Sequence, residues 1–110
     1  MWLITTFGFF SAVQKPGDTE LTVRARVRAD LEALREKYAP TLGEITASAG
    51  TDYPFRARIA HEDFAEAVRR AALDIRYDNF KSEVARVQGW TREGVYANVW
   101  SVLRKLQPGG

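Results

Sequence analysis

The phrase "VRARV" at residues 23–27 returns later in the chain as "FRARI" at residues 55–59. In both copies apolar or small residues alternate with arginine, which is typical of a β-strand with one apolar and one charged face. Each copy follows a turn signal, Pro16–Asp18 in the first half and Gly50–Asp52 in the second. Residues at helical spacing follow each copy. The repeat therefore predicts two β-β-α units in one chain.

The first unit is predicted to begin with one long strand over residues 2–13, which is rich in aromatic and β-branched side chains. Its alternation puts Leu3, Thr5, Phe7 and Phe9 on one face and Trp2, Ile4, Gly8 and Phe10 on the other. The second unit is predicted to begin with a strand in "GEITASAG", through Ile45, Ala47 and Ala49. The helical stripes are Leu31, Leu34 and Tyr38, ended by Pro40, and Phe64, Val68, Ala71 and Ile75.

Two such units predict an α+β fold. A single hairpin with its helix buries too little apolar surface to be stable, whereas two can share a four-stranded antiparallel sheet with both helices on one face. This order of elements is a circular permutation of the ferredoxin-like sandwich. We expect a single domain over residues 1–110, with the duplicated unit in 1–75 and a C-terminal helical pair in 76–107.

The C-terminal pair is predicted from its caps and its apolar stripe. Asp78 is expected to cap the first helix, Gly89 to end it, and Thr91 to cap the last helix. Because that helix carries the strongest stripe in the chain, we expect Trp100 to be largely buried. The strand over 2–13 is apolar on both faces, so the helical pair or a partner subunit is expected to cover the second face of the sheet. The stripe consists of Val95, Val99, Val102, Leu103 and Leu106.

Composition excludes several classes of protein. The chain has no cysteine, which rules out disulfides, thiolate metal sites and cysteine nucleophiles and suits a reducing, cytoplasmic compartment. Sixteen basic and fourteen acidic residues give a net charge of only +2, far from that of a dedicated duplex-DNA binder. No apolar run approaches the length of a membrane span.

No motif predicts an enzyme. The sequence has neither a nucleophile elbow nor a glycine-rich phosphate loop. His61 is the only histidine, and its place at the start of a helix is typical of a surface residue. We therefore predict no catalytic residue, no metal ligand and no cofactor.

The arginines of the repeat are the candidate site. Alternation places Arg24, Arg26, Arg56 and Arg58 on the sheet face away from the helices that follow their strands. Guanidinium groups bind phosphate and carboxylate through a planar fork, so this face can bind an anionic ligand. In "RYDNFK", Asn79 and Lys81 are candidates to line the same site.

Two alternatives remain open at this site. The arginines can instead pair with acidic side chains of the C-terminal helices, such as Asp78, Glu83 and Glu93, or lie in water. The "FGFF" run at residues 7–10 resembles the aromatic signature of RNA-recognition motifs. Packing in the core is the better interpretation of that run, because the basic residue that flanks the motif is absent.

Several phrases, spread over nearly the whole chain, resemble a family of small uncharacterised bacterial proteins. The resemblance implies no activity. The sequence departs from the family's pattern at Gly94 and Ala97, where relatives tend to carry histidine. The phrases are FGFFS (7–11), QKPGD (14–18), LTVRAR (21–26), DLEALR (30–35), GTDYPFRAR (50–58), YDNFK (77–81) and VYANVWSVLRKLQ (95–107).

Two functions therefore stay open. The first is a non-enzymatic protein that binds a nucleotide or single-stranded RNA through the arginine-bearing face. The second is a protein-interaction or regulatory subunit, or a homodimer, in which the arginines are structural ion-pair partners.

Overall fold

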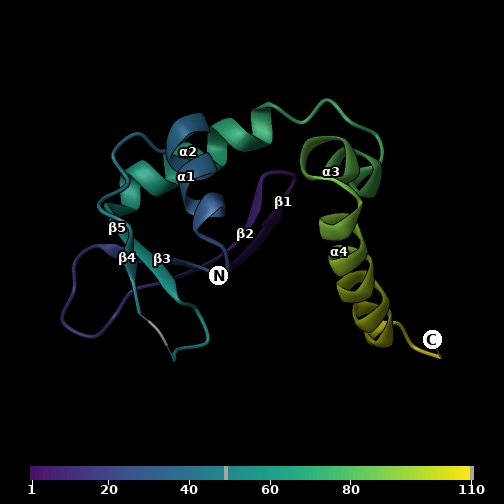
Figure 1. Ribbon diagram of the computed structural model, residues 1–110, viewed down its shortest axis with the longest axis horizontal. Helices are drawn as coiled ribbons and strands as arrows, with labels where there is room; N and C mark the ends of the chain where they lie inside the picture. The colour runs from purple at the N-terminus through teal and green to yellow at the C-terminus, as the bar shows by residue number, and fades with distance from the viewer. Residues whose placement is uncertain (49, 110) are drawn as a thin grey trace. The chain divides into compact units, whose positions relative to one another are not determined.

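A five-stranded antiparallel sheet with the strand order β1-β2-β3-β5-β4 organises the first of two compact units, residues 1–75 (Figure 1). The computed structural model describes residues 1–48 and 50–109. The α+β class is confirmed, whereas the predicted number of four strands is wrong. The strands are β1 (Trp2–Thr5), β2 (Gly8–Val13), β3 (Leu21–Ala25), β4 (Thr46–Ala47) and β5 (Phe55–Ile59).

The additional strand arises because the chain reverses within the strand predicted over residues 2–13. Thr6 and Phe7 form a two-residue turn between β1 and β2, with Thr5 paired to Gly8. The Thr5 hydroxyl accepts hydrogen bonds from the amides of Phe7 and Gly8, at 3.2 and 3.0 Å, and donates to the Gly8 carbonyl at 2.8 Å. A β-branched polar residue thus stabilises a turn that lacks the usual proline or asparagine-glycine signal.

The reversal also changes which side chains share a face. Leu3 pairs with Phe10, and both belong to the side that packs on the helices, where Phe10 is fully buried. Ile4 pairs with Phe9 on the opposite face. The predicted grouping of Leu3 with Phe9 and of Ile4 with Phe10 is therefore wrong, because alternation does not continue through a turn.

The two copies of the repeated phrase pair with each other. β3 and β5 are neighbours in the sheet, and Arg24 lies directly opposite Arg56 while Val23 lies opposite Ala57. The predicted hairpin of β2 with β3 is also present, with Ser11 opposite Arg24. The arginine-bearing strands are thus neighbours in the interior of the described sheet, with β3 at its centre and β5 next to the edge strand β4.

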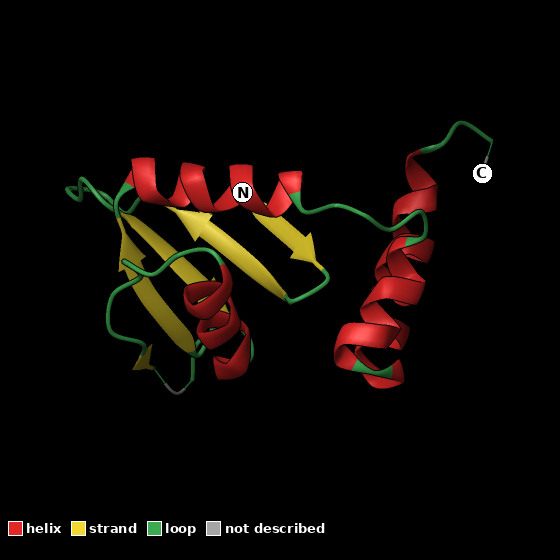
Figure 2. Cartoon of the chain, turned by 90° about the horizontal axis from the view of Figure 1, so that it is seen from above, coloured by secondary structure: helices red, strands yellow, loops and turns green. Residues whose placement is uncertain are grey.

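Helices α1 (Arg28–Lys37) and α2 (His61–Leu73) pack on one face of this sheet (Figure 2). The predicted stripes are largely confirmed, although Ile75 lies beyond the end of α2 and is 53% exposed. α1 ends before Pro40, as expected. The fully or almost fully buried core includes Phe10, Val23, Ala25, Leu31, Leu34, Ala57, Ile59, Phe64 and Ala67.

The strand predicted in "GEITASAG" is reduced to the two residues of β4. Ile45 is buried just before the strand, Ala47 is exposed, and Ala49 lies outside the described residues. Arg35 of α1 donates hydrogen bonds to the carbonyls of Leu42 and Gly43. These bonds, with the one from the Gly43 amide to the Arg58 carbonyl, hold the segment before β4 beside β5 outside the regular ladder.

The second unit, residues 76–110, contains α3 (Phe80–Gln88), α4 (Trp90–Leu103) and a 3₁₀ turn at Arg104–Leu106. Asn79, not Asp78, caps α3, because its side-chain oxygen accepts from the Ser82 amide at 2.9 Å. Gly89 ends α3 as predicted. It also occupies the N-cap position of α4 with φ of +94°, so Thr91 lies inside α4 and caps nothing.

Packing inside the second unit centres on Tyr96. Its ring stacks on that of Phe80, with 5.9 Å between the ring centroids. Val84 of α3 is fully buried. Trp100 is 54% exposed, so its predicted burial is wrong; Val95, Val102, Leu103 and Leu106 of the same stripe are exposed as well. That the pair covers the second face of the sheet stays a prediction. No helix in the described ranges is long and apolar enough to cross a membrane.

Asp30 links α1 to the first hairpin. Its carboxylate is buried, with the residue 4% exposed, and accepts a hydrogen bond from the Phe9 amide at 3.0 Å. We expect Asp30→Ala to lower the free energy of unfolding by about 1–3 kcal/mol, because the partly buried Phe9 amide loses its acceptor. Urea denaturation followed by circular dichroism measures this. Glu36→Ala, an exposed position on the same helix, is the control, and equal effects of the two changes would contradict the assignment.

The packing of the second unit gives a matched pair of changes. Tyr96→Ala should remove about 3 kcal/mol from the stability of the helical pair, because it truncates a buried ring. Trp100→Ala should cost less than about 1 kcal/mol, as exposed positions do. Thermal loss of helical ellipticity reports both. A larger loss for Trp100→Ala would show that Trp100 is covered.

Candidate anion-binding site on the sheet

One row of side chains crosses the sheet on the face opposite α1 and α2. The strand register aligns one residue from each of the five strands, and alternation along each strand gives all of them this face. The row thus brings an indole, two guanidinium groups and two hydroxyls into one line. Its members are Trp2, Ser11, Arg24, Arg56 and Thr46.

Arg24 is held in the centre of the row. Its Nη2 donates to the Ser11 hydroxyl at 2.7 Å, and Ser11 is itself only 1% exposed. The Nε atom of Arg24 is buried and has no hydrogen-bond partner in the part of the chain that the structure describes. Part of the guanidinium group therefore keeps an unused donor, which is costly to bury.

Tyr53 lies under two of the arginines. The Cζ atoms of Arg24 and Arg26 lie 4.6 and 4.8 Å from the centroid of its ring, within the range of cation–π contacts. Tyr53 is 3% exposed, and Arg56 Nε donates to its carbonyl at 3.2 Å. Three of the four predicted arginines thus gather around one buried tyrosine.

The four arginines differ in their acidic partners. Arg58 lies 3.6 Å from Asp18 and 3.4 Å from Glu20, both in the segment between β2 and β3. No carboxylate of the described residues forms an ion pair with Arg24, Arg26 or Arg56. Structural pairing is therefore present for one arginine, with acids of a hairpin loop.

Of the acids named as alternative partners, Glu83 is engaged within its own helix. Arg86 donates two hydrogen bonds to its carboxylate, which lowers the pKa of Glu83. Asp78 and Glu93 also belong to the second unit, and no ion pair from either to a described residue is present.

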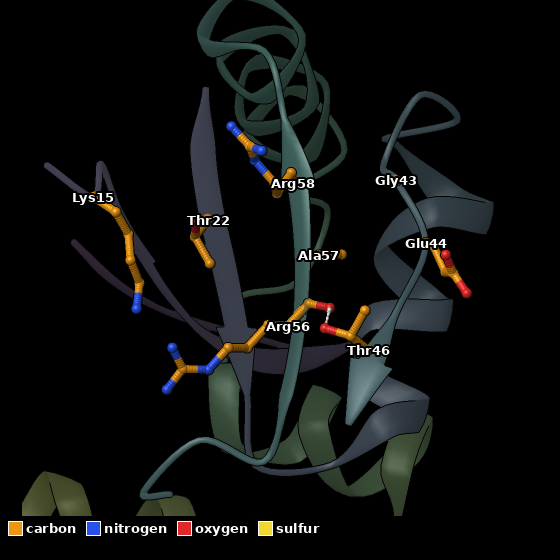
Figure 3. Close-up of a pocket in the computed structure, with 8 residues that line it drawn as sticks. All are labelled: Lys15, Thr22, Gly43, Glu44, Thr46, Arg56, Ala57 and Arg58. Atoms are coloured by element: carbon orange, nitrogen blue, oxygen red, sulfur yellow. Dashed lines mark hydrogen bonds between the residues drawn. The ribbon is translucent and has the colours of Figure 1, made fainter. Parts of the chain in front are cut away.

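A pocket of about 420 Å³ lies over β5, beside the row. Figure 3 shows Lys15, Arg56 and Arg58 extending on the side of β5 away from Glu44, whose carboxylate points in the opposite direction. The Gly43 amide donates to the Arg58 carbonyl at 2.8 Å and so joins the segment before β4 to β5. The lining residues are Lys15, Thr22, Gly43, Glu44, Thr46, Arg56, Ala57 and Arg58.

Two aromatic side chains, exposed Trp2 and half-buried Phe9, lie at the β1 end of the row. Trp2 is 69% exposed and meets Phe9 edge to face, with 5.6 Å between the ring centroids. Within the "FGFF" run, Phe7 and Phe10 belong to the core, as predicted, whereas Phe9 belongs to the arginine-bearing face.

The remaining predicted residues have local roles. Asn79 caps α3, and the Lys81 ammonium lies 4.9 Å from the centroid of the Trp100 ring; both belong to the second unit. His61 Nδ1 lies 3.2 Å from the Thr19 carbonyl at the start of α2. The described residues hold no group of three or more His, Cys, Asp or Glu side chains able to bind a metal ion.

The sequence interpretation missed Tyr53, Ser11 and Lys15. Ser11 could have been found from the strand register, once the early turn was known. Alternation alone would put Tyr53 on the same face as Phe55. Tyr53 precedes β5, however, and strand alternation does not extend to it. Lys15 lies in a loop, and only the folded hairpin brings it to the pocket.

Comparison with protein-family models, with curated proteins and with solved structures finds no match. The resemblance to small bacterial proteins therefore stays a prediction. The candidate site is argued from its geometry alone.

Repulsion between the central arginines should be measurable. Arg24 and Arg56 lie directly opposite each other, and like charges in this position destabilise a sheet. We expect Arg56→Gln to raise the free energy of unfolding at low salt by about 0.2–1 kcal/mol, since glutamine keeps an N–H donor while removing the charge. The gain should shrink at high salt.

Urea titrations at two salt concentrations test this. Arg69→Gln, on the exposed side of α2 beside Glu66, is the matched control and should not be stabilising. A salt-independent loss of stability in Arg56→Gln would show that the two guanidinium groups do not repel each other.

Proposed function

We propose that this protein binds single-stranded RNA, without catalysis, across the sheet face opposite α1 and α2. The observation that carries the proposal is the group of three arginines, Arg24, Arg26 and Arg56, which surround Tyr53 and pair with no carboxylate in the described ranges. A phosphate backbone supplies the anions that this group lacks. A nucleotide is the smaller ligand with the same chemistry.

The cost of this arrangement supports a ligand. The guanidinium groups of Arg24 and Arg56 face each other across the neighbouring strands β3 and β5, and Arg24 leaves a buried Nε donor unused. Each feature lowers the stability of the free protein. An anion that binds Arg24 or Arg56 offsets the repulsion between them, because charge-assisted hydrogen bonds are about twice as strong as neutral ones. The Nε atom of Arg24 is buried and stays out of reach of such a ligand.

The aromatic groups favour a single strand over a duplex. Unpaired bases stack on exposed rings, and Trp2 with Phe9 offers such a platform next to the row. A duplex hides its base faces and is bound mainly through many phosphates. The net charge of +2 is small for that mode of binding.

We also propose that the strands β2-β3-β5-β4 with α1 and α2 form a permuted ferredoxin-like sandwich built from a duplicated β-β-α unit, to which β1 adds an edge strand. The strand order and the antiparallel pairing support this interpretation. So does the register, which sets the first arginine of each repeated phrase opposite that of the other.

Fluorescence anisotropy with a short RNA that carries a 5′-hydroxyl and a 3′ dye tests the function. Arg26→Ala/Arg56→Ala should weaken binding and reduce the magnitude of the slope of log K against log salt by about 1.4, or about 0.7 per lost phosphate contact. Lys37→Ala/Arg69→Ala removes two charges from exposed helix positions and should leave the slope unchanged. Trp2→Ala should weaken binding by about 1–3 kcal/mol.

Contradiction would take one of two forms. Either the parent fails to bind RNA at low salt, or the two double variants lose affinity equally, which would indicate attraction by net charge alone.

A protein-interaction or regulatory role is the second candidate. It is favoured by the exposed apolar side chains of α4, such as Val95, Val102 and Leu103. A self-associated species in sedimentation velocity, together with absent RNA binding, would support it.

A further inference from the structure

We propose that the pocket over β5 binds a phosphate monoester, the terminal phosphate of an RNA strand or of a nucleotide. For the strand end, this inference rests on the proposed function. The pocket lies at the β5–β4 edge of the sheet, whereas Trp2 lies on β1 at the other edge. A strand that crosses the face from Trp2 therefore reaches the pocket with one of its ends.

The lining groups suit a phosphate. Lys15, Arg56 and Arg58 provide three cationic groups from the hairpin loop and from β5. Thr22 is only 6% exposed and lines the pocket, so it supplies a hydroxyl group that can donate to a phosphate. The one lining carboxylate, that of Glu44, points away from the cations.

The charge of the pocket favours a monoester over an internal diester. A terminal phosphate carries about −1.5 to −2 at pH 7, because its second pKa is about 6, whereas a diester carries one negative charge. A dianion makes fuller use of the three cations that line the pocket. The extra charge also gives binding a pH dependence that an internal phosphate lacks.

The hairpin loop supplies both a cation and competing anions. Asp18 and Glu20 lie 3.6 and 3.4 Å from the guanidinium group of Arg58, longer than the roughly 2.7–2.9 Å of a strong charge-assisted hydrogen bond. Such loose, exposed pairs are weak. A phosphate in the pocket therefore displaces these carboxylates from Arg58.

The experiment compares 3′-labelled RNAs of one sequence with a 5′-phosphate or a 5′-hydroxyl, and 5′-labelled RNAs with a 3′-phosphate or a 3′-hydroxyl. A terminal phosphate at one end should tighten binding about tenfold, the contribution of one well-bound charged group. The gain should fall as the pH drops through about 6, where the monoester loses its second charge. Adenosine monophosphate and inorganic phosphate, as competitors, distinguish the strand end from a free nucleotide or free phosphate.

Two variants separate the pocket from the rest of the face. Lys15→Gln/Arg58→Gln should abolish the gain from the terminal phosphate, measured as the ratio of the affinities for phosphate-ended and hydroxyl-ended RNA, so that a loss of general attraction cancels. Asp18→Asn/Glu20→Gln should increase the gain, because Arg58 loses its competing anions. This second variant keeps all the cations, so the inference stays testable even if the first fails to fold.

Equal affinity for phosphate-ended and hydroxyl-ended RNA in the parent would overturn the inference and leave the proposed function intact. A gain that survives in Lys15→Gln/Arg58→Gln would overturn it as well. Two results together would support the pocket and refute the proposed function. In the first, monophosphate binding depends on Lys15 and Arg58. In the second, the affinity for hydroxyl-ended RNA is unchanged by Arg26→Ala/Arg56→Ala.

Discussion

The antiparallel pairing of β3 with β5 is the contact on which the first unit depends. It joins the two halves of the chain in the centre of the sheet and buries Val23 and Ala57 against α1 and α2. The same register that aligns the apolar side chains forces Arg24 to face Arg56 on the other side. A shift by one residue would relieve this repulsion but would turn every core side chain toward solvent. Burial of the core therefore fixes the charge cluster.

The cluster is tolerated because arginine can do more than carry a charge. Its guanidinium group is planar and weakly hydrated, so it can cover an aromatic ring. Arg24 and Arg26 both contact Tyr53, which lets a tyrosine be buried on a sheet face that carries no helix of the same unit. A lysine at these positions would provide charge without this flat cover.

Sequence alone was sufficient where a pattern is local and repeated. The alternation in the two RAR phrases predicted β3, β5 and the shared face of Arg24 and Arg56, and helical spacing predicted α1 and α2. It failed where one side chain decides the outcome. The Thr5 hydroxyl creates a turn without a composition signal.

Tertiary contacts explain the other differences. Arg35 of α1 holds the segment before β4 through its bonds to Leu42 and Gly43, and the local sequence of β4 does not predict these bonds. The exposure of Trp100 could not be read from its stripe either, since periodicity shows which face of a helix is apolar but not how much of it a neighbour covers. Tyr53 and Lys15 were not predicted because each reaches the site from a loop, where strand and helix periodicity do not apply.

The repeat is preserved in sequence but not in environment. Arg26 and Arg58 hold the same place in their phrases, yet Arg26 contacts the ring of Tyr53 while Arg58 is held by Asp18 and Glu20. The difference follows from the loops: the segment before β3 is acidic and lies beside β5, whereas the turn before β5 supplies a tyrosine. Arg58 thus has counter-ions in the hairpin loop, whereas the described residues supply no carboxylate to Arg24, Arg26 or Arg56. The proposed anionic ligand would supply the counter-charge that Arg24, Arg26 and Arg56 lack, and it would compete with Asp18 and Glu20 for Arg58.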